Sequence, residues 1–291
     1  MSLIQAISLL TICLGAFVNA VNTVNTINVV EVDLVFPRNA TYAPTENFPF
    51  IFAFQNPEYA ELLNAQLWYQ VWEFGTFGKG LFWNVRDLRW ANWSSSDPYL
   101  VYQHHNLTTL TTPGRKLWMK WGVHWQSCDQ EALLSPNSSG GMVRNAWTWG
   151  RMFTIANSTE SPDWEVDLVA ATSVNTCPED KNAADINVTD VVMDVPSSVN
   201  WARRDTCVLT VNSASNDTKT HTLDPCAVTI TPNVAARISC SIDSQPEDCL
   251  KNNDGVDQPT IAVGATGILA LLGELESLLI QFGSFFSGFW Y

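Results

Sequence analysis

The sequence predicts an all-β protein: an antiparallel, immunoglobulin-like β-sandwich, followed by a smaller disulfide-linked β region and a hydrophobic C-terminal tail. Two observations predict the sandwich. Apolar and polar residues alternate along several segments between residues 29 and 155, and stretches rich in Pro, Gly, Asn and Ser separate these segments. Alternation gives each strand one apolar face to bury, and two sheets can bury such faces against each other. Helical periodicity is nearly absent before the tail.

Four segments carry the alternation most clearly. They are VVEVDLVF (29–36), FPFIFAF (48–54), KLWMKWGVHWQ (116–126) and AWTWGRMFTI (146–155). Their apolar faces are expected to form the core of a Trp-rich sandwich domain over residues 21–160. Glu31 and Asp33 in the first segment, and Trp118 in the third, are expected to face outward. Trp149 in the fourth is expected to face inward.

A second block follows a turn at Ser161-Pro162. DWEVDLVAAT (163–172) repeats the pentapeptide EVDLV of residues 31–35, which suggests another opening strand. Further short strands are predicted at CVLTV (207–211), CAVTI (226–230) and AARISCSI (235–242). We therefore place a domain boundary near residue 160 and assign residues 161–250 to a disulfide-rich β region, with residues 251–291 as a tail.

The N-terminus has the features of a secretory signal peptide. Residues 1–20 carry no charged side chain, hold an apolar run and end in Val18-Asn19-Ala20, so cleavage is expected after Ala20. An anchor helix is the alternative, but the apolar run is shorter than the ~20 residues of a typical span. Seven N-x-S/T sequons without proline also indicate a secreted glycoprotein. They begin at Asn39, Asn92, Asn106, Asn137, Asn157, Asn187 and Asn216.

Cysteine parity suggests a bridge between the two blocks. Of seven cysteines, Cys13 leaves with the signal peptide, and the remaining six suit an oxidising compartment. The first block then holds Cys128 alone, so a fully bridged protein needs one disulfide between the blocks. We predict three pairs, of which the first is that cross-link: Cys128–Cys177, Cys207–Cys226 and Cys240–Cys249.

Composition and motifs argue against several classes of function. The formal net charge of −14, with scattered Lys and Arg, gives no footprint for nucleic acid. Motifs for serine hydrolases, zinc proteases and phosphate binding do not occur, and neither a cofactor nor a metal site is expected. His104 and His105 are expected to be solvated loop residues. A glycosidase needs only two suitably spaced carboxylates, so a carbohydrate-active enzyme stays open as an alternative.

Several motifs resemble a family of secreted ascomycete fungal proteins that is defined by a domain of unknown function. The motifs are VFPRNATYAPT, FPFIFAFQNPEYAELLN, DLRWANWSSSDPY, WQSCD, EVDLVAAT and INVTD. The resemblance covers roughly residues 29 to 249. It implies a fungal extracellular protein and supplies no catalytic residues to carry over.

Two tryptophans are candidates for ligand binding. In RWANWSSSDPY (89–99), an extended chain would point Trp90 and the Asn92 sequon to one face and Trp93 to the other. A glycan on Asn92 requires its face to be exposed, so Trp93 is expected in the core and Trp90 at the surface. Trp118 is the second outward candidate. Such rings can stack on foreign sugars, on the protein's own glycans or on neighbouring strands.

These observations favour a non-catalytic glycoprotein of the cell surface or cell wall with a structural or adhesive role. A carbohydrate-binding accessory module that uses Trp90 and Trp118 is the main alternative, with cell-wall polysaccharide as its partner. A carbohydrate-active enzyme or a secreted effector is a further alternative.

The tail, residues 251–291, suggests a glycosylphosphatidylinositol (GPI) signal. Small residues around Asn253 (or Asn252) precede a polar spacer and a hydrophobic C-terminal end, as at an anchor site. Glu274 and Glu276 within the apolar stretch argue against this interpretation. A retained amphipathic helix on a membrane or partner, or a disordered tail, is the alternative.

Treatment of intact cells with phosphatidylinositol-specific phospholipase C tests the anchor. We expect release of a protein that ends near Asn253, because the residues after it would be removed when the anchor is attached. A C-terminal peptide containing Trp290-Tyr291, recovered from the cell-associated protein, would contradict the prediction.

Overall fold

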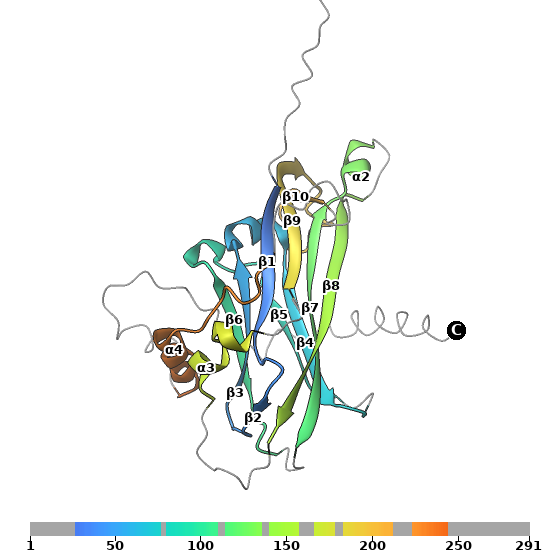
Figure 1. Cartoon of the computed structure of the whole chain (residues 1–291). Helices are drawn as coiled ribbons and strands as arrows, with labels where there is room; N and C mark the ends of the chain where they lie inside the picture. Colours follow the sequence, from blue (N-terminus) through green and yellow to red (C-terminus); the bar gives the residue numbers. More distant parts are fainter. Residues whose placement is uncertain are drawn as a thin grey trace, which may run out of the picture.

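Two five-stranded sheets pack face to face in the computed structural model (Figure 1), which describes residues 27–76, 80–109, 114–135, 140–156, 166–177, 183–211 and 223–243. Sheet A has, in spatial order, β10 (Thr206–Val211), β9 (Ala183–Asp194), β1 (Ile27–Phe36), β3 (Phe48–Gln55) and β6 (Tyr99–His105). Sheet B has β2 (Thr41–Tyr42), β8 (Met142–Ile155), β7 (Arg115–Cys128), β4 (Gln66–Glu73) and β5 (Gly80–Asp87). All described pairings are antiparallel except that of β2 with β8. The predicted β-sandwich is confirmed.

Short helices complete the described chain. Three are 3₁₀ helices: η1 (Pro57–Leu63), η2 (Trp93–Ser95) and η3 (Val174–Thr176). The α-helices are α2 (Gln130–Leu134), α3 (Leu168–Ala171) and α4 (Pro232–Asp243). The predicted signal peptide, Asn253 and the tail lie outside the described residues.

The core between the sheets is built on the phenylalanines of β3. The ring of Phe48 stacks on Phe153 at 5.7 Å between centroids, that of Phe50 stacks on Tyr69 at 5.1 Å, and Phe52 meets Trp121 at 5.4 Å. All of these rings are at most 2% exposed. Each aromatic side chain buries ~150–250 Å² of surface, and offset or edge contacts between rings add further stabilisation. This row therefore contributes much of the burial that holds the sheets together.

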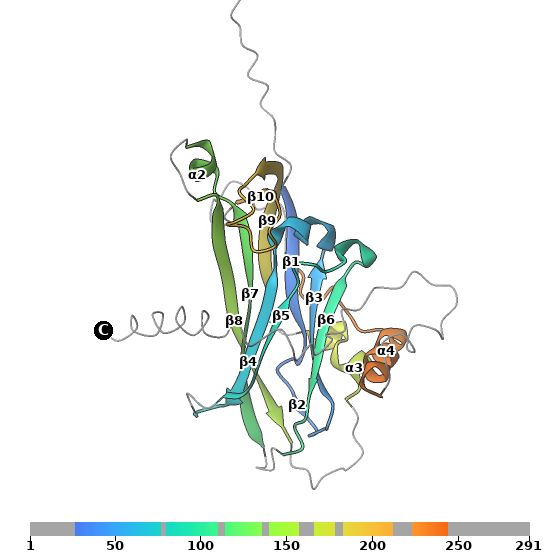
Figure 2. The same ribbon diagram turned by 180° about the vertical axis from the view of Figure 1, so that it is seen from behind.

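Sheet A is covered on its second face as well. Helices α3 and α4 and the segment before α4 lie against it on the side away from sheet B (Figures 1 and 2). Leu168, Ile230 and Ile238 from this layer are buried in the same cluster as Ile51, which points outward from β3. Burial on both faces explains why FPFIFAF is almost continuously apolar.

This covering layer contradicts three predicted strands. Residues of DWEVDLVAAT form α3, because the Asp167 side chain accepts a hydrogen bond from Ala170 N at 3.0 Å and caps the helix. The segment AARISCSI lies in α4, which begins at Pro232, a residue suited to the first helical turn. CAVTI (226–230) is irregular, whereas CVLTV lies in β10 as predicted.

The predicted domain boundary near residue 160 does not divide the fold. Strand β9 pairs with β1 from Ile27↔Thr189 to Asp33↔Ala183, and β10 extends the same sheet. Residues on both sides of position 160 therefore share one sheet and one core, and the region 161–250 is not a separate β unit. A local sequence pattern does not show this pairing of β1 with β9, because the two strands are about 150 residues apart in the chain.

Two of the predicted disulfides are wrong. Cys128 pairs with Cys207, with 5.4 Å between the Cα atoms, and Cys177 pairs with Cys226, with 5.8 Å. The Cys128–Cys207 bridge does join the two sequence blocks, as parity required. Cys207 is on β10, which lies beside the end of β7, whereas Cys177 follows η3 in the covering layer with Cys226. Cys249 lies outside the described residues, so Cys240–Cys249 stays a prediction.

Glu31 and Asp33, predicted to face solvent, are buried beneath the covering layer. Gln55 Nε2 donates to Asp33 Oδ2 at 2.8 Å, and Asp224 N donates to Glu31 Oε1 at 2.8 Å. Burial, followed by the negative charge of neighbouring Glu31, raises the pKa of Asp33 to about 9. Asp33 is therefore protonated at neutral pH. The alternation in residues 29–36 predicts the two faces of β1, but a layer formed by residues later in the chain covers the polar face.

Replacement of Asp33 by Asn should remove a pH-dependent loss of stability. In wild type the folded state holds a proton on Asp33 that the unfolded state has lost above pH ~4, so stability falls as the pH rises towards 9. We expect the melting temperature of Asp33→Asn to exceed that of wild type at pH 9 by roughly 5–10 °C, and the difference to shrink towards pH 5. Differential scanning calorimetry across this range measures it.

The exposed Asp190 on β9 provides the control for this experiment. Asp190→Asn should shift the melting temperature equally little at every pH. Parallel pH profiles for wild type and Asp33→Asn would show that Asp33 is ionised in the folded protein.

Candidate functional site

The outward face of sheet B carries an aromatic surface. Its members are outward-facing, at least partly exposed side chains on four neighbouring strands: Trp68 and Trp72 of β4, Trp83 of β5, Trp118 of β7 and Met152 of β8. We call this set the outer aromatic face. The strand register sets Trp72 directly opposite Trp118, and Trp118 directly opposite Met152. Directly opposite residues have neighbouring Cβ atoms, so these three side chains form a continuous row.

Two glycines let the indole rings lie along the sheet. A Cβ at Gly150 would stand 2.1 Å from Cζ2 of Trp118, and one at Gly122 would stand 3.0 Å from Nε1 of Trp68. The rings therefore occupy the space above the glycine backbones of adjacent strands. A ring that lies over a glycine keeps its other face available to solvent or a ligand.

Polar groups are interspersed among the rings. The ammonium group of the exposed Lys120 lies 5.8 Å from the ring centroid of Trp68, within cation–π range. Gln70 projects from the same face, and His124 lies beside Trp68 with 6.0 Å between ring centroids. Burial lowers the pKa of His124, so this imidazole is neutral at physiological pH. Flat apolar rings with nearby hydrogen-bonding groups suit the face of a sugar ring and its hydroxyls.

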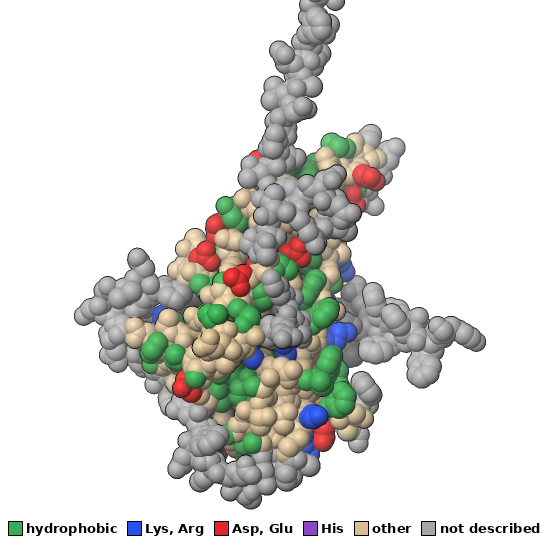
Figure 3. Space-filling model, viewed as in Figure 1, with side chains coloured by type: hydrophobic (Ala, Val, Ile, Leu, Met, Phe, Trp, Pro, Cys, Tyr) green, Lys and Arg blue, Asp and Glu red, His purple; other side chains and the backbone are tan. Residues whose placement is uncertain are grey.

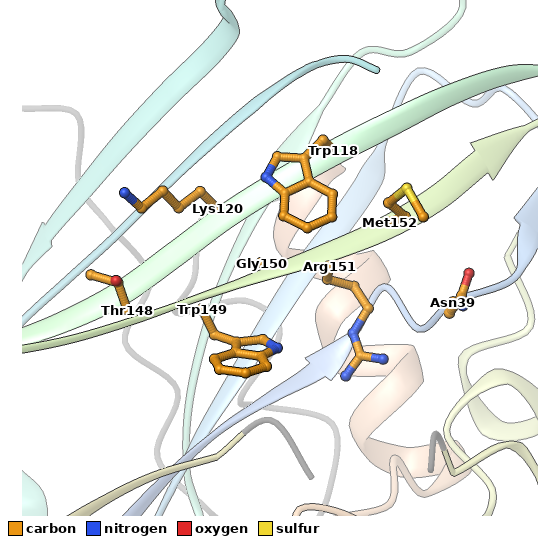
Figure 4. Close-up of a pocket in the computed structure, with 8 residues that line it drawn as sticks. All are labelled: Asn39, Trp118, Lys120, Thr148, Trp149, Gly150, Arg151 and Met152. Carbon is orange, nitrogen blue, oxygen red and sulfur yellow. The ribbon is translucent and has the colours of Figure 1, made fainter. Parts of the chain in front are cut away.

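An open pocket of about 500 Å³ lies at the β8 end of this surface. It is lined by Asn39, Trp118, Lys120, Thr148, Trp149, Gly150, Arg151 and Met152. In Figure 4, Trp118 and Met152 stand on one side of β8, whereas Trp149 and Arg151 lie on the other. Basic and hydrophobic side chains gather along this part of the molecule, at the right of Figure 3. The pocket thus wraps around the β8 strand.

Trp149 shows that the inner face of β8 is only partly covered. It shares the inward face with Trp147 and Phe153, as predicted, but its side chain is 49% exposed. Strand β8 lies near the margin of the sandwich, where the two-residue strand β2 is its neighbour in the sheet. Trp149 therefore belongs to the pocket rather than to the core.

The connection between β9 and β10 covers the outer surface at the other end of sheet B. Gln126, which shares the outward face with Trp118, is buried and accepts from Trp201 N at 2.7 Å and Asn64 Nδ2 at 3.0 Å. The guanidinium of Arg144 lies 5.4 Å from the Trp201 ring. The outer aromatic face therefore begins next to this polar network and extends along the strands towards the pocket.

Trp118 lies on the outer aromatic face, as the sequence predicted, but Trp90 does not. Trp90 is 69% exposed in the turn before η2, and the Arg204 guanidinium lies 4.9 Å from its ring. Trp93 is buried against Phe54, with 5.1 Å between ring centroids, and the core prediction is confirmed. The two rings separate because the chain turns and forms η2, not because an extended strand alternates.

Sequence reasoning missed Trp68, Trp72 and Trp83. The segment QLWYQVWE (66–73) alternates a buried face containing Tyr69 with an outer face containing both tryptophans. That alternation could have identified Trp68 and Trp72. Both faces of the segment carry large apolar side chains, however, so the pattern does not show which face is buried in the core.

The prediction for His104 and His105 is wrong, because both are half-buried at the end of β6. His105 stacks on Phe82 at 4.2 Å, and its Nε2 lies 2.7 Å from the Tyr69 hydroxyl. Burial lowers the pKa of each histidine to about 4. Among the described residues, no group of three or more His, Cys, Asp or Glu side chains could hold a metal ion.

The sequons differ in accessibility. Asn39, Asn92 and Asn106 are exposed, whereas Asn187 is half-buried in β9 between β1 and β10. Asn137, Asn157 and Asn216 lie outside the described residues. Glycosylation at all seven stays a prediction.

Residues 25–258 match the family defined by the domain of unknown function DUF7136, and the chain belongs to that family. The match includes both sheets and the covering layer, which agrees with a single unit spanning position 160. No curated protein and no solved structure matches the chain significantly.

Proposed function

We propose that this protein is a secreted, non-catalytic glycoprotein of the fungal cell surface or cell wall that adheres to polysaccharide through its outer aromatic face. The observation that carries the proposal is the set of tryptophans on the solvent side of sheet B. A sandwich needs apolar residues only on the sides that it buries. Trp83 is 63% exposed, and its neighbours Leu81 and Val85 are exposed as well. These side chains therefore do not belong to the buried core of the sandwich.

The chemistry of this face favours a neutral glycan over a protein partner. The rings lie on three strands, β4, β5 and β7, and the polar side chains of Gln70 and Lys120 lie among them. A polysaccharide chain presents apolar ring faces and hydroxyl groups in alternation, which matches such a surface.

An extracellular setting supports the same proposal. The two disulfides fit an extracellular protein, and the exposed sequons would be accessible for glycosylation. None of the helices in the described part of the chain has the length and apolar character that a membrane span requires. The sequence resemblance described above supports a fungal source and an extracellular location.

The enzyme alternative finds less support at this site. The described residues that line the pocket supply two indoles, two basic side chains and no carboxylate. A glycosidase usually places two carboxylates on opposite sides of the bond that it cleaves. Turnover of glycan substrates by the purified protein would overturn the non-catalytic proposal.

Retention on insoluble polysaccharide tests the proposed function. We expect the wild-type protein to bind at least one of chitin, β-glucan or cellulose in a depletion assay. Trp72→Ala and Trp83→Ala should each weaken that binding about fivefold, because one aromatic contact contributes ~1 kcal/mol. Unchanged melting temperatures would show that the variants remain folded.

Trp90→Ala is the matched control for Trp83→Ala, because Trp90 is 69% exposed against 63% for Trp83 but lies outside the outer aromatic face. It should bind as wild type does. If only Trp90→Ala weakened binding, or if no polysaccharide retained the wild-type protein, the proposal would be wrong.

A further inference from the structure

We propose that a glycan attached to Asn39 folds back into the β8 pocket and packs its first sugars against Met152 and Trp118. Asn39 begins the sequon Asn39-Ala40-Thr41 and is itself one of the residues that line the pocket. The inference requires glycosylation at this sequon and is independent of the proposed polysaccharide binding. It assigns an intramolecular ligand to Trp118.

The attachment point is held firmly beside the pocket. Thr154 N on β8 donates to Ala40 O at 2.9 Å, and Ala156 N donates to Tyr42 O at 2.8 Å. On the other side of Asn39, Arg38 is buried and its Nη2 donates to Thr172 O at 2.9 Å. A sequon fixed on both sides limits the directions in which its glycan can leave, which lowers the entropy lost when the glycan docks.

The path from Asn39 leads over apolar side chains. In Figure 4, Asn39 lies beside β8 near Met152, below the strand in this view, and the Trp118 ring lies farther along the strand on its upper side. One face of that ring lies over Gly150, so the opposite face is the surface on which a sugar can stack. Thr148 and Lys120 border the far end and supply hydrogen-bonding groups.

The dimensions suit a small oligosaccharide. The pocket of about 500 Å³ lies within the ~300–1,000 Å³ typical of small-molecule sites, and it opens to solvent. Its opening would let the outer branches of the glycan extend into solvent while the first sugars are held. Asn106 is also exposed, but it does not line this pocket, so a glycan there would lack the same support.

Such a glycan would also define the free part of the outer aromatic face. It would cover the Met152–Trp118 end and leave Trp72, Trp68 and Trp83 open. The glycosylated protein would then use a smaller binding surface than the unglycosylated polypeptide presents.

Enzymatic removal of glycans from the native protein tests the inference. The glycoprotein is treated with peptide-N-glycosidase F without denaturation, and the loss of glycan at each site is followed by mass spectrometry of its peptides. We expect release at Asn39 to be at least tenfold slower than at Asn106. Trp118→Ala should raise the rate at Asn39 to that at Asn106, with no change at Asn106.

Gly150→Ala provides a second variant that keeps the tryptophan. Its added Cβ would stand 2.1 Å from Cζ2 of Trp118 and displace the ring, so release at Asn39 should again accelerate. Equal release at Asn39 and Asn106 in the wild-type protein would overturn the inference. So would slow release at Asn39 that neither variant alters, or an Asn39 peptide that never carries a glycan.

The thermal stability of Asn39→Gln supplies an independent readout. The substitution should lower the melting temperature by about 2–4 °C in the wild-type background and by less than 1 °C in the Trp118→Ala background. Equal losses in both backgrounds would contradict docking on Trp118.

The outcome of these measurements can be distinguished from the outcome of the polysaccharide test of the proposed function. Protection of the Asn39 glycan with no retention on polysaccharide would leave the inference standing and refute the proposed function. Retention on polysaccharide without protection of the Asn39 glycan would leave the proposed function standing and refute the inference.

Discussion

The fold depends on burying both faces of β3. Its phenylalanines meet Tyr69, Trp121 and Phe153 across the sandwich, while Ile51 and Ala53 on its other face are fully buried beneath the covering layer. A strand that is apolar on both faces is stable only between two layers. Sheet B provides one layer. The second comes from α3, α4 and the segment before α4, which therefore belong to the same folding unit as the strands.

This arrangement determines which surface is free to act. Sheet B covers one side of sheet A, and the covering layer lies against the other side around Ile51. The β9–β10 connection closes the far end of sheet B through Gln126 and Trp201. The outward side of β4, β5, β7 and β8 carries the tryptophans and the pocket. The candidate site is thus a part of the sandwich that the other described segments leave uncovered.

Buried polar groups and disulfides fasten the covering segments to the sheets. Asp224 N donates to the carboxyl group of Glu31 on β1, and Arg38 Nη2 donates to the carbonyl of Thr172 beside α3. The Cys177–Cys226 bridge ties two parts of the covering layer together, and Cys128–Cys207 joins the two sheets near their ends. Hydrogen bonds and covalent links of this kind are directional, so they fix where a layer docks after apolar burial has brought it close.

The sequence by itself determined the strands β1, β3, β7, β8 and β10 and the inward faces of β1, β3 and β7, because alternation depends only on the two-residue repeat of an extended chain. It also determined that Trp93 is buried and Trp118 is outward, and that a disulfide must link the two halves. Only the tertiary structure decided what covers each outward face. It buried Glu31 and Asp33, exposed Trp149, placed β9 beside β1, and gathered Trp68, Trp72, Trp83 and Trp118 into one surface. These outcomes depend on contacts between segments far apart in the chain, which a local pattern cannot encode.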